Sequence, residues 1–216
     1  MKKLEAAYAR ANRRLQSWVD RQIEQDAVKV ARLYRASRGA LMERLAGVYT
    51  MYLGDEPSYD RARMTGALQA IDRHVDEVVS DMMGEINTRT ALQQADMMSR
   101  GTARVGRSLK RTGLTFAELP VGLRDVVDSL ETTIVAGGTY ADRLFHHSAK
   151  LRSELQSQVK QGLLSGEDFD SVRARVMKVF GVDKLSTPKS HAYGSVKHYK
   201  NAARLQWNRL MRAHAE

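Results

Sequence analysis

The first fifty residues carry an uninterrupted helical pattern of apolar side chains, and this pattern most limits what the chain can fold into. From Leu4 to Tyr52 an apolar residue recurs every three or four positions, which is the period of a helix and not the alternation of a strand. Some members of the pattern lie eleven positions apart: Tyr8, Val19, Val30, Leu41 and Tyr52. An eleven-residue period keeps a stripe on one side of a straight or slightly right-handed helix. We therefore expect one very long helix that packs along a partner over its whole length.

A second long helix follows the first after a short break. Gly54 and Pro57 end the first helix, and Ser58 is a suitable N-cap for an apolar line that continues to Leu109. Two helices of about 50 residues joined by a short turn favour an antiparallel, coiled-coil-like hairpin over residues 1–112. Each helix would be about 75 Å long at 1.5 Å per residue, which exceeds the diameter of a compact body of this size. We therefore expect part of the apolar seam to need neighbouring proteins or to lie exposed.

Residues 113–216 are expected to form a second domain, a smaller C-terminal helical bundle. Glycines, caps and apolar spacing predict helices at 121–135, 140–164, 167–180 and 198–216, with a loop at 182–197. Gly181 is the predicted C-cap of the third of these helices. Because no stretch alternates convincingly, the predicted fold class is all-α.

Composition excludes several classes of protein. The chain has no cysteine, so disulfides, thiolate metal sites and cysteine nucleophiles are ruled out. No apolar run approaches the roughly 18 residues of a membrane span, and the charges among the first 14 residues argue against a signal peptide. The net charge of +10 is grouped: residues 96–112 hold 5 basic and 1 acidic residue, and residues 186–216 hold 6 and 1. Such zones fit a protein that meets a polyanion or an acidic protein surface.

No motif for catalysis or cofactor binding is present. The sequence contains no zinc-protease signature, phosphate-binding glycine loop, nucleophile elbow or dinucleotide fingerprint. His191 and His198 flank part of the predicted loop, but no carboxylate lies between them to complete a metal site. We expect a protein that is not an enzyme and needs neither metal nor cofactor, with a catalytic site in that loop as the least favoured alternative.

Two sets of basic residues are the candidate binding sites. The first has the spacing 4, 3, 4, which places its members on one helical face: Arg100, Arg104, Arg107 and Arg111. The second makes the C-terminal segment basic: Lys197, Lys200, Arg204 and Arg212. Like charges one turn apart repel, so the first set implies an anionic partner, and a merely solvated face is the alternative. Arginine forks suit phosphates and carboxylates equally, so DNA and a protein surface both stay open.

The last third of the chain resembles the bacteriophage head morphogenesis family, the Mu F-like minor head proteins. The residues that carry the resemblance are Tyr140-Ala141-Asp142-Arg143-Leu144, Leu151, Leu155, the turn Gln161-Gly162-Leu163-Leu164-Ser165-Gly166, Phe169-Asp170-Ser171-Val172, Ala202-Ala203-Arg204-Leu205 and Arg212-Ala213. The similarity covers roughly residues 120–216. At Trp207, Asn208 and Arg209 the chain departs from the arginine, threonine and glutamate of the family signature.

The resemblance implies a minor structural protein of a tailed phage or phage-like particle. It implies a place inside the head near the portal, assembly in the host cytoplasm, and portal or major capsid protein as partner. Contact with packaged double-stranded DNA and membership of a large assembly or homo-oligomer are further expectations. The alternative function is a sequence-independent DNA-binding helical protein outside a virion.

Overall fold

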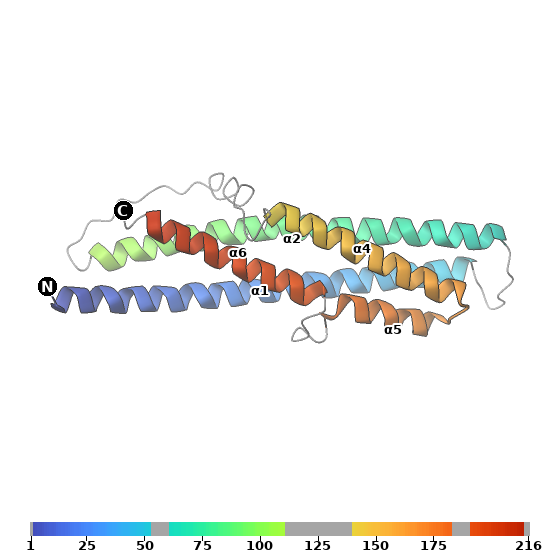
Figure 1. The fold of residues 1–216 in the computed structure, drawn as a ribbon, viewed down its shortest axis with the longest axis horizontal. Coiled ribbons are helices and arrows are strands. Elements are labelled where there is room, and N and C mark those ends of the chain that lie inside the picture. The colour runs from blue at the N-terminus through green and yellow to red at the C-terminus, as the bar shows by residue number, and fades with distance from the viewer. Residues whose placement is uncertain (1, 53–60, 111–139, 183–190, 214–216) are drawn as a thin grey trace. The chain divides into compact units, whose positions relative to one another are not determined.

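The computed structural model describes residues 2–52, 61–110, 140–182 and 191–213. These residues are almost entirely helical and contain no strand (Figure 1). The helices are α1 (Lys2–Tyr52), α2 (Arg61–Lys110), α4 (Tyr140–Leu164), α5 (Phe169–Phe180) and α6 (His191–Ala213). The predicted all-α class, with a long helix pair followed by smaller helices, is confirmed. The predicted helix at 121–135 and the predicted break at Gly54, Pro57 and Ser58 lie outside the described residues.

The residues group into two compact units, each assembled from segments that are far apart in sequence. Unit 1 consists of Met1–Val28, Thr88–Ala141 and His198–Glu216. Unit 2 consists of Lys29–Asn87 and Asp142–Lys197. The division into domains at 1–112 and 113–216 stays a prediction, and each unit takes residues from both sides of that boundary.

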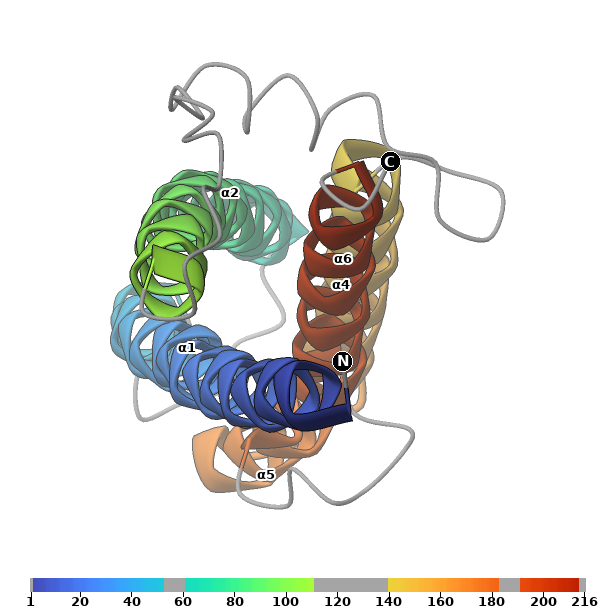
Figure 2. The ribbon, with the colours of Figure 1, turned by 90° about the vertical axis from the view of Figure 1, so that its left-hand side faces the viewer.

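In unit 1, the start of α1, the end of α2 and most of α6 surround an apolar interior (Figure 2). Two tryptophans mark its centre, since Trp18 of α1 is 9% exposed and Trp207 of α6 is 1% exposed. Their neighbours in the interior are Val19, Ile23, Ala95, Met97, Tyr199, Ala202 and Ala203. All three segments therefore contribute to one core.

Gly101 lets α2 approach both tryptophans. A Cβ atom at this position would lie 2.4 Å from Cζ3 of Trp207 and 3.6 Å from Cζ3 of Trp18. Because the shorter distance is far below van der Waals contact, only glycine fits without moving the ring of Trp207. The close approach fixes the spacing of α2 from α6 in this unit.

In unit 2, the second half of α1 and the first half of α2 pack with α4 and α5. The interior includes Tyr34, Leu41, Leu45, Ile71, Val75, Leu151, Leu155, Val172 and Phe180, all fully buried. The eleven-residue stripe predicted from the sequence is buried at Val19, Val30 and Leu41, which confirms the face of α1 that packs inward.

Over the described side chains, later helices cover most of the apolar seam of the long helices, and the expected need for neighbouring proteins stays a prediction. In unit 2 the apolar residues of α1 and α2 are covered by α4 and α5, as the edge-to-face contact of Tyr34 with Phe180 at 6.4 Å shows. In unit 1 they are covered by α6. Helix length alone does not predict this covering, because it depends on later helices that pack along the pair in each unit.

Glycines and a carboxylate define the corner between α4 and α5. Gly166 has a φ of 71°, and the amide of Glu167 donates to the carbonyl of Gly162 at 2.9 Å, as in a Schellman-type helix end. Asp168 then caps α5 by accepting from the amide of Ser171 at 2.8 Å. Gly181, with a φ of 61°, ends α5, so the predicted C-cap is confirmed.

The predicted loop at 182–197 is wrong over its last part, because α6 begins at His191 and not at residue 198. Gly194 suggested a loop, but its missing side chain has a packing reason: a Cβ atom there would lie 2.9 Å from Cε1 of His147. Ser195 is buried, and its hydroxyl lies 2.5 Å from that of Tyr34. Tertiary packing thus outweighs the weak helix propensity of glycine and serine.

Candidate anion-binding surface

Positive charge is concentrated in unit 1. Its described segments 2–28, 88–110 and 198–213 contain 6, 5 and 4 basic residues against 4, 1 and 0 acidic ones, which is 15 against 5. The charged residues of the described part of unit 2 are 16 basic and 11 acidic. The two basic zones found in the sequence, around residues 96–112 and 186–216, contribute most of their described charge to the same unit.

Most acidic residues of unit 1 bind groups of the same unit. Glu24 of α1 lies 2.5 Å from Nζ of Lys200, and Asp20 lies 3.4 Å from Nε of Arg204. Asp26 is buried and accepts a hydrogen bond from the hydroxyl of Tyr199 at 3.2 Å. Lys200 and Arg204, both candidate binding residues from the sequence, therefore hold α6 against α1.

The arginine row on α2 is exposed, as its spacing predicts. Arg100, Arg104 and Arg107 all face solvent. Nε of Arg100 lies 2.7 Å from the carboxylate of Asp96, and Nε of Arg107 donates to the carbonyl of Ala103 at 3.2 Å. Both contacts are made within one turn of α2, so they leave the row on the surface.

Arg104 also makes a contact between helices. Its guanidinium carbon lies 4.8 Å from the centre of the Trp18 ring, which is a cation–π distance. This contact covers an indole that would otherwise be partly open to solvent, and it brings the α2 row next to α1. Arg111, the fourth predicted member, lies outside the described residues.

The other two predicted residues of the C-terminal set have different surroundings. Lys197 is exposed on α6 but belongs to unit 2. Arg212 lies within α6 in unit 1, and the described contacts do not include its side chain. The C-terminal set is therefore not a single cluster, and the α2 row is the better-defined candidate.

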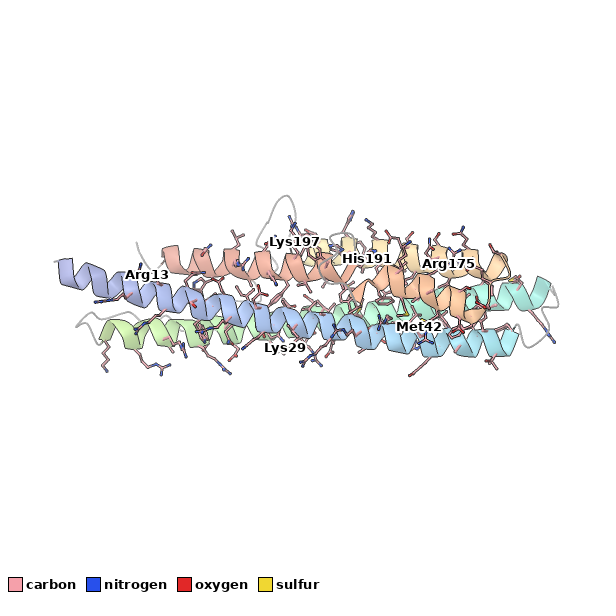
Figure 3. All side chains as sticks on the ribbon, turned by 90° about the horizontal axis from the view of Figure 1, so that it is seen from below. Arg13, Lys29, Met42, Arg175, His191 and Lys197 are labelled. Carbon is pink, nitrogen blue, oxygen red and sulfur yellow. The ribbon has the colours of Figure 1, made fainter. Side chains whose placement is uncertain are left out.

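Sequence reasoning did not single out the basic residues of α1 that accompany this row. Arg14 and Arg21 precede and follow Trp18 in α1, and both are exposed. Arg13, labelled in Figure 3, is exposed as well. The sequence could have indicated these residues, because Arg14 and Arg21 are seven residues, or two helical turns, apart. Only the register of the two helices shows that they accompany the α2 row.

His191 of α6 is structural in its contacts. His191 is 6% exposed, and its Nε2 lies 2.8 Å from a carboxylate oxygen of Glu154. The ring of His147 lies edge-on to it at 6.4 Å between centroids. Since residues 191–198 are helical, the loop site considered for His191 and His198 does not form there. In the described part of the chain, no three His, Cys, Asp or Glu side chains are grouped to hold a metal ion.

Electrostatic perturbations are found at the α4–α5 corner of unit 2. The carboxylate of Glu167 forms a two-pronged pair with Arg175, at 2.8 and 2.5 Å, and this hydrogen bonding raises the pKa of Arg175. Burial raises the pKa of Tyr49 to about 12, with further contributions from the charges of Glu167 and Asp168. The capping hydrogen bonds from Ser171 lower the pKa of Asp168. These shifts serve the fold of the corner and involve no member of the arginine row.

Comparison of the chain with protein-family models, with curated proteins and with solved structures found no match. Among the helices described, none is both long and apolar enough to cross a membrane.

Proposed function

We propose that this chain is a minor structural protein of a tailed-phage or phage-like head, where it docks on portal or major capsid protein. The single observation that carries the proposal is the order of helix, glycine turn and capped helix from residue 140 to residue 182, with which the resemblance to the head morphogenesis family begins. In this chain the first helix, the glycine turn and the capped helix each have a packing or capping role.

Several of the residues that carry the resemblance are packing or turn residues. Leu151, Leu155 and Val172 are fully buried in unit 2. Gly162 has no room for a side chain, since a Cβ atom there would lie 2.5 Å from Cγ2 of Val172. Gly166 takes the left-handed conformation that ends α4. A set of residues that builds one helical corner is what a shared fold would retain, which supports the proposal.

The chain departs from the family signature at Trp207, and this departure is compatible with a structural protein. Trp207 fills the centre of unit 1 against Gly101, so a large apolar side chain at this position has a structural use. A structural protein that binds through helical surfaces also agrees with the exposed basic row on α2.

The test is the composition of purified particles. Heads would be isolated on a density gradient from cells that carry the genome encoding this chain, and their proteins identified and quantified by mass spectrometry. We expect the chain in the particle fraction at a low and constant ratio to major capsid protein, and lost from it when portal protein is deleted. A chain that is expressed but absent from purified heads contradicts the proposal.

The alternative, a DNA-binding protein outside a virion, is favoured by the ratio of 15 basic to 5 acidic residues in unit 1. The same fractionation separates the two functions. A DNA-binding protein of the cell would be recovered with cellular DNA and not with heads.

A further inference from the structure

We infer that unit 1 carries a binding face for the phosphate backbone of double-stranded DNA, formed by two rows of arginines on α1 and α2. We call it the cation face, and its members are Arg14, Arg21, Arg100, Arg104 and Arg107. The inference does not rest on the proposed function, because it uses only contacts and charges within unit 1.

The register of α1 and α2 places the two rows side by side. The contact between Trp18 and Arg104 joins the helices, which run antiparallel in this unit (Figure 1). One turn toward the start of α1 leads to Arg14, and the matching turn toward the end of α2 leads to Arg107. One turn in the opposite direction leads to Arg21 and Arg100. The two rows therefore lie along neighbouring helices about 8–10 Å apart, with a guanidinium about every 5 Å along α2 and two guanidiniums about 10 Å apart along α1.

Negative charge is almost excluded from this face. Residues 6–19 and 97–110 contain no aspartate or glutamate. Among the described residues, Asp96 pairs with Arg100, while Asp20 and Glu24 line a hollow of α1 beside Arg21 but are paired with Arg204 and Lys200 of α6. All five guanidiniums are exposed, so they repel one another and attract a shared polyanion.

Among the side chains that the structure describes, the face has no apolar centre, which favours nucleic acid over a protein partner. Protein interfaces generally have an apolar core within a polar rim. Here the one aromatic residue between the rows, Trp18, is 9% exposed and lies under Arg104. A face of cations alone fits the backbone of DNA, which carries one negative charge per about 1.7 Å of duplex.

The same contact favours a duplex over a single strand. Proteins that bind single strands stack bases on exposed aromatic rings. The ring of Trp18 is not available for stacking, because one face is taken by Arg104 and its edge lies against Gly101. Since phosphate contacts carry no sequence information, we expect the binding to be independent of sequence.

The experiment measures binding of the purified full chain to fluorescein-labelled duplexes of mixed sequence, about 30 base pairs long, by fluorescence anisotropy. The variant R14Q/R21Q/R107Q removes three members of the face and leaves Arg100 and Arg104, which contact Asp96 and Trp18. The control R32Q/R35Q/R73Q removes three exposed arginines from the same two helices in unit 2, so it changes the net charge equally.

We expect the unit 1 variant to bind at least roughly tenfold more weakly at about 100 mM salt, and the control variant to stay within about threefold of the parent. The slope of log affinity against log salt should become shallower by about 2.7 in the unit 1 variant, since each phosphate contact contributes about 0.9. A third variant, R14K/R21K/R107K, keeps the charge and should keep the slope. This result would indicate that the glutamine variant binds weakly because of its lost charges and not because of a defect in its fold.

Three results overturn the inference. The first is equal weakening by the unit 1 and unit 2 variants, which indicates attraction by net charge alone. The second is binding that does not change with salt. The third is tighter binding of single-stranded DNA or of an acidic peptide than of the duplex. None of these results bears on the presence of the chain in heads, so the two proposals fail separately.

Discussion

Replacing Gly101 by alanine tests whether the tryptophan pair sets the spacing of the helices in unit 1. In an exposed helix interior this change gains about 1 kcal/mol, because alanine has the higher helix propensity. At Gly101 the added Cβ atom would lie 2.4 Å from Cζ3 and 2.6 Å from Cη2 of Trp207. Overpacking of a core costs about 1–3 kcal/mol. Since the ring of Trp207 is 1% exposed and has little room to move, we expect a cost in the upper part of that range, about 2–3 kcal/mol, and therefore a net loss of about 1–2 kcal/mol after the gain in helix propensity.

The chain provides its own probe for this measurement. Its two tryptophans, Trp18 and Trp207, both lie in unit 1, so tryptophan fluorescence reports the unfolding of that unit by urea. We expect Gly101→Ala to lower the midpoint of the fluorescence transition. Trp207→Phe alone should also lower the free energy of unfolding, because it leaves a cavity. The double variant of Gly101→Ala and Trp207→Phe should lose less stability than the two single variants lose together.

Gly84→Ala is the matched control on the same helix, since no atom lies within 4 Å of a Cβ atom placed there. It should stabilise by up to about 1 kcal/mol, measured by circular dichroism at 222 nm. The reasoning is refuted by a Gly101→Ala variant that is as stable as the parent or more so. Strict additivity of the Gly101 and Trp207 changes would refute it as well.

Three further predictions concern unit 2. Tyr49→Phe should leave stability unchanged or raise it by up to about 1 kcal/mol in urea unfolding, since the described residues offer its buried hydroxyl no hydrogen-bond partner. By absorbance, the parent should show one tyrosine more than this variant that ionises near pH 12. Because a raised pKa favours the neutral form, the stability that the parent owes to Tyr49 should fall between about pH 10 and pH 12, and the variant should lack this fall. Asp168→Ala should lower the thermal midpoint at pH 7 more than Asp168→Asn does. The difference in midpoint between Asp168→Ala and the parent should shrink as the pH falls below about 4, because Asp168 stabilises the fold only while its carboxylate is ionised. A difference that stays constant with pH contradicts this prediction. Leu155→Ala, at a fully buried site of α4, should cost about 2–5 kcal/mol in urea unfolding, whereas a cost below about 1 kcal/mol would mean that α4 is not part of the core.

The sequence predicted the helices well where apolar spacing was regular and long. The inward face of α1 follows from the eleven-residue stripe, and Val19, Val30 and Leu41 are buried as expected. The end of α5 was equally clear, because Gly181 is a glycine at the end of an apolar pattern and takes the left-handed conformation.

The sequence failed at the start of α6, where Gly194 and Ser195 were interpreted as loop residues. Their reasons for being in a helix are contacts with His147 and Tyr34, which are distant in sequence. A helical spacing was nevertheless present, since Ala192, Ser195 and Tyr199 are all buried on one face. Short helical patterns that contain glycine are ambiguous until their partners are known.

The candidate site was predicted in part. Spacing alone identified the exposed row of Arg100, Arg104 and Arg107. It did not show that Lys200 and Arg204 are paired with carboxylates of α1, because ion pairs between distant segments depend on the tertiary fold. For the same reason it did not join Arg14 and Arg21 of α1 to the row on α2.

The pairing of the first helix with the last one has a consequence during synthesis. Asp20 and its partner Arg204 are 184 positions apart, so the core around Trp18 stays incomplete until α6 leaves the ribosome. At about 5–20 residues per second, the delay is roughly 10–40 s. Throughout that time the start of α1 presents bare apolar side chains to the cell. Nascent chains of this protein should therefore recruit chaperones through their first thirty residues, well before the remainder has been translated.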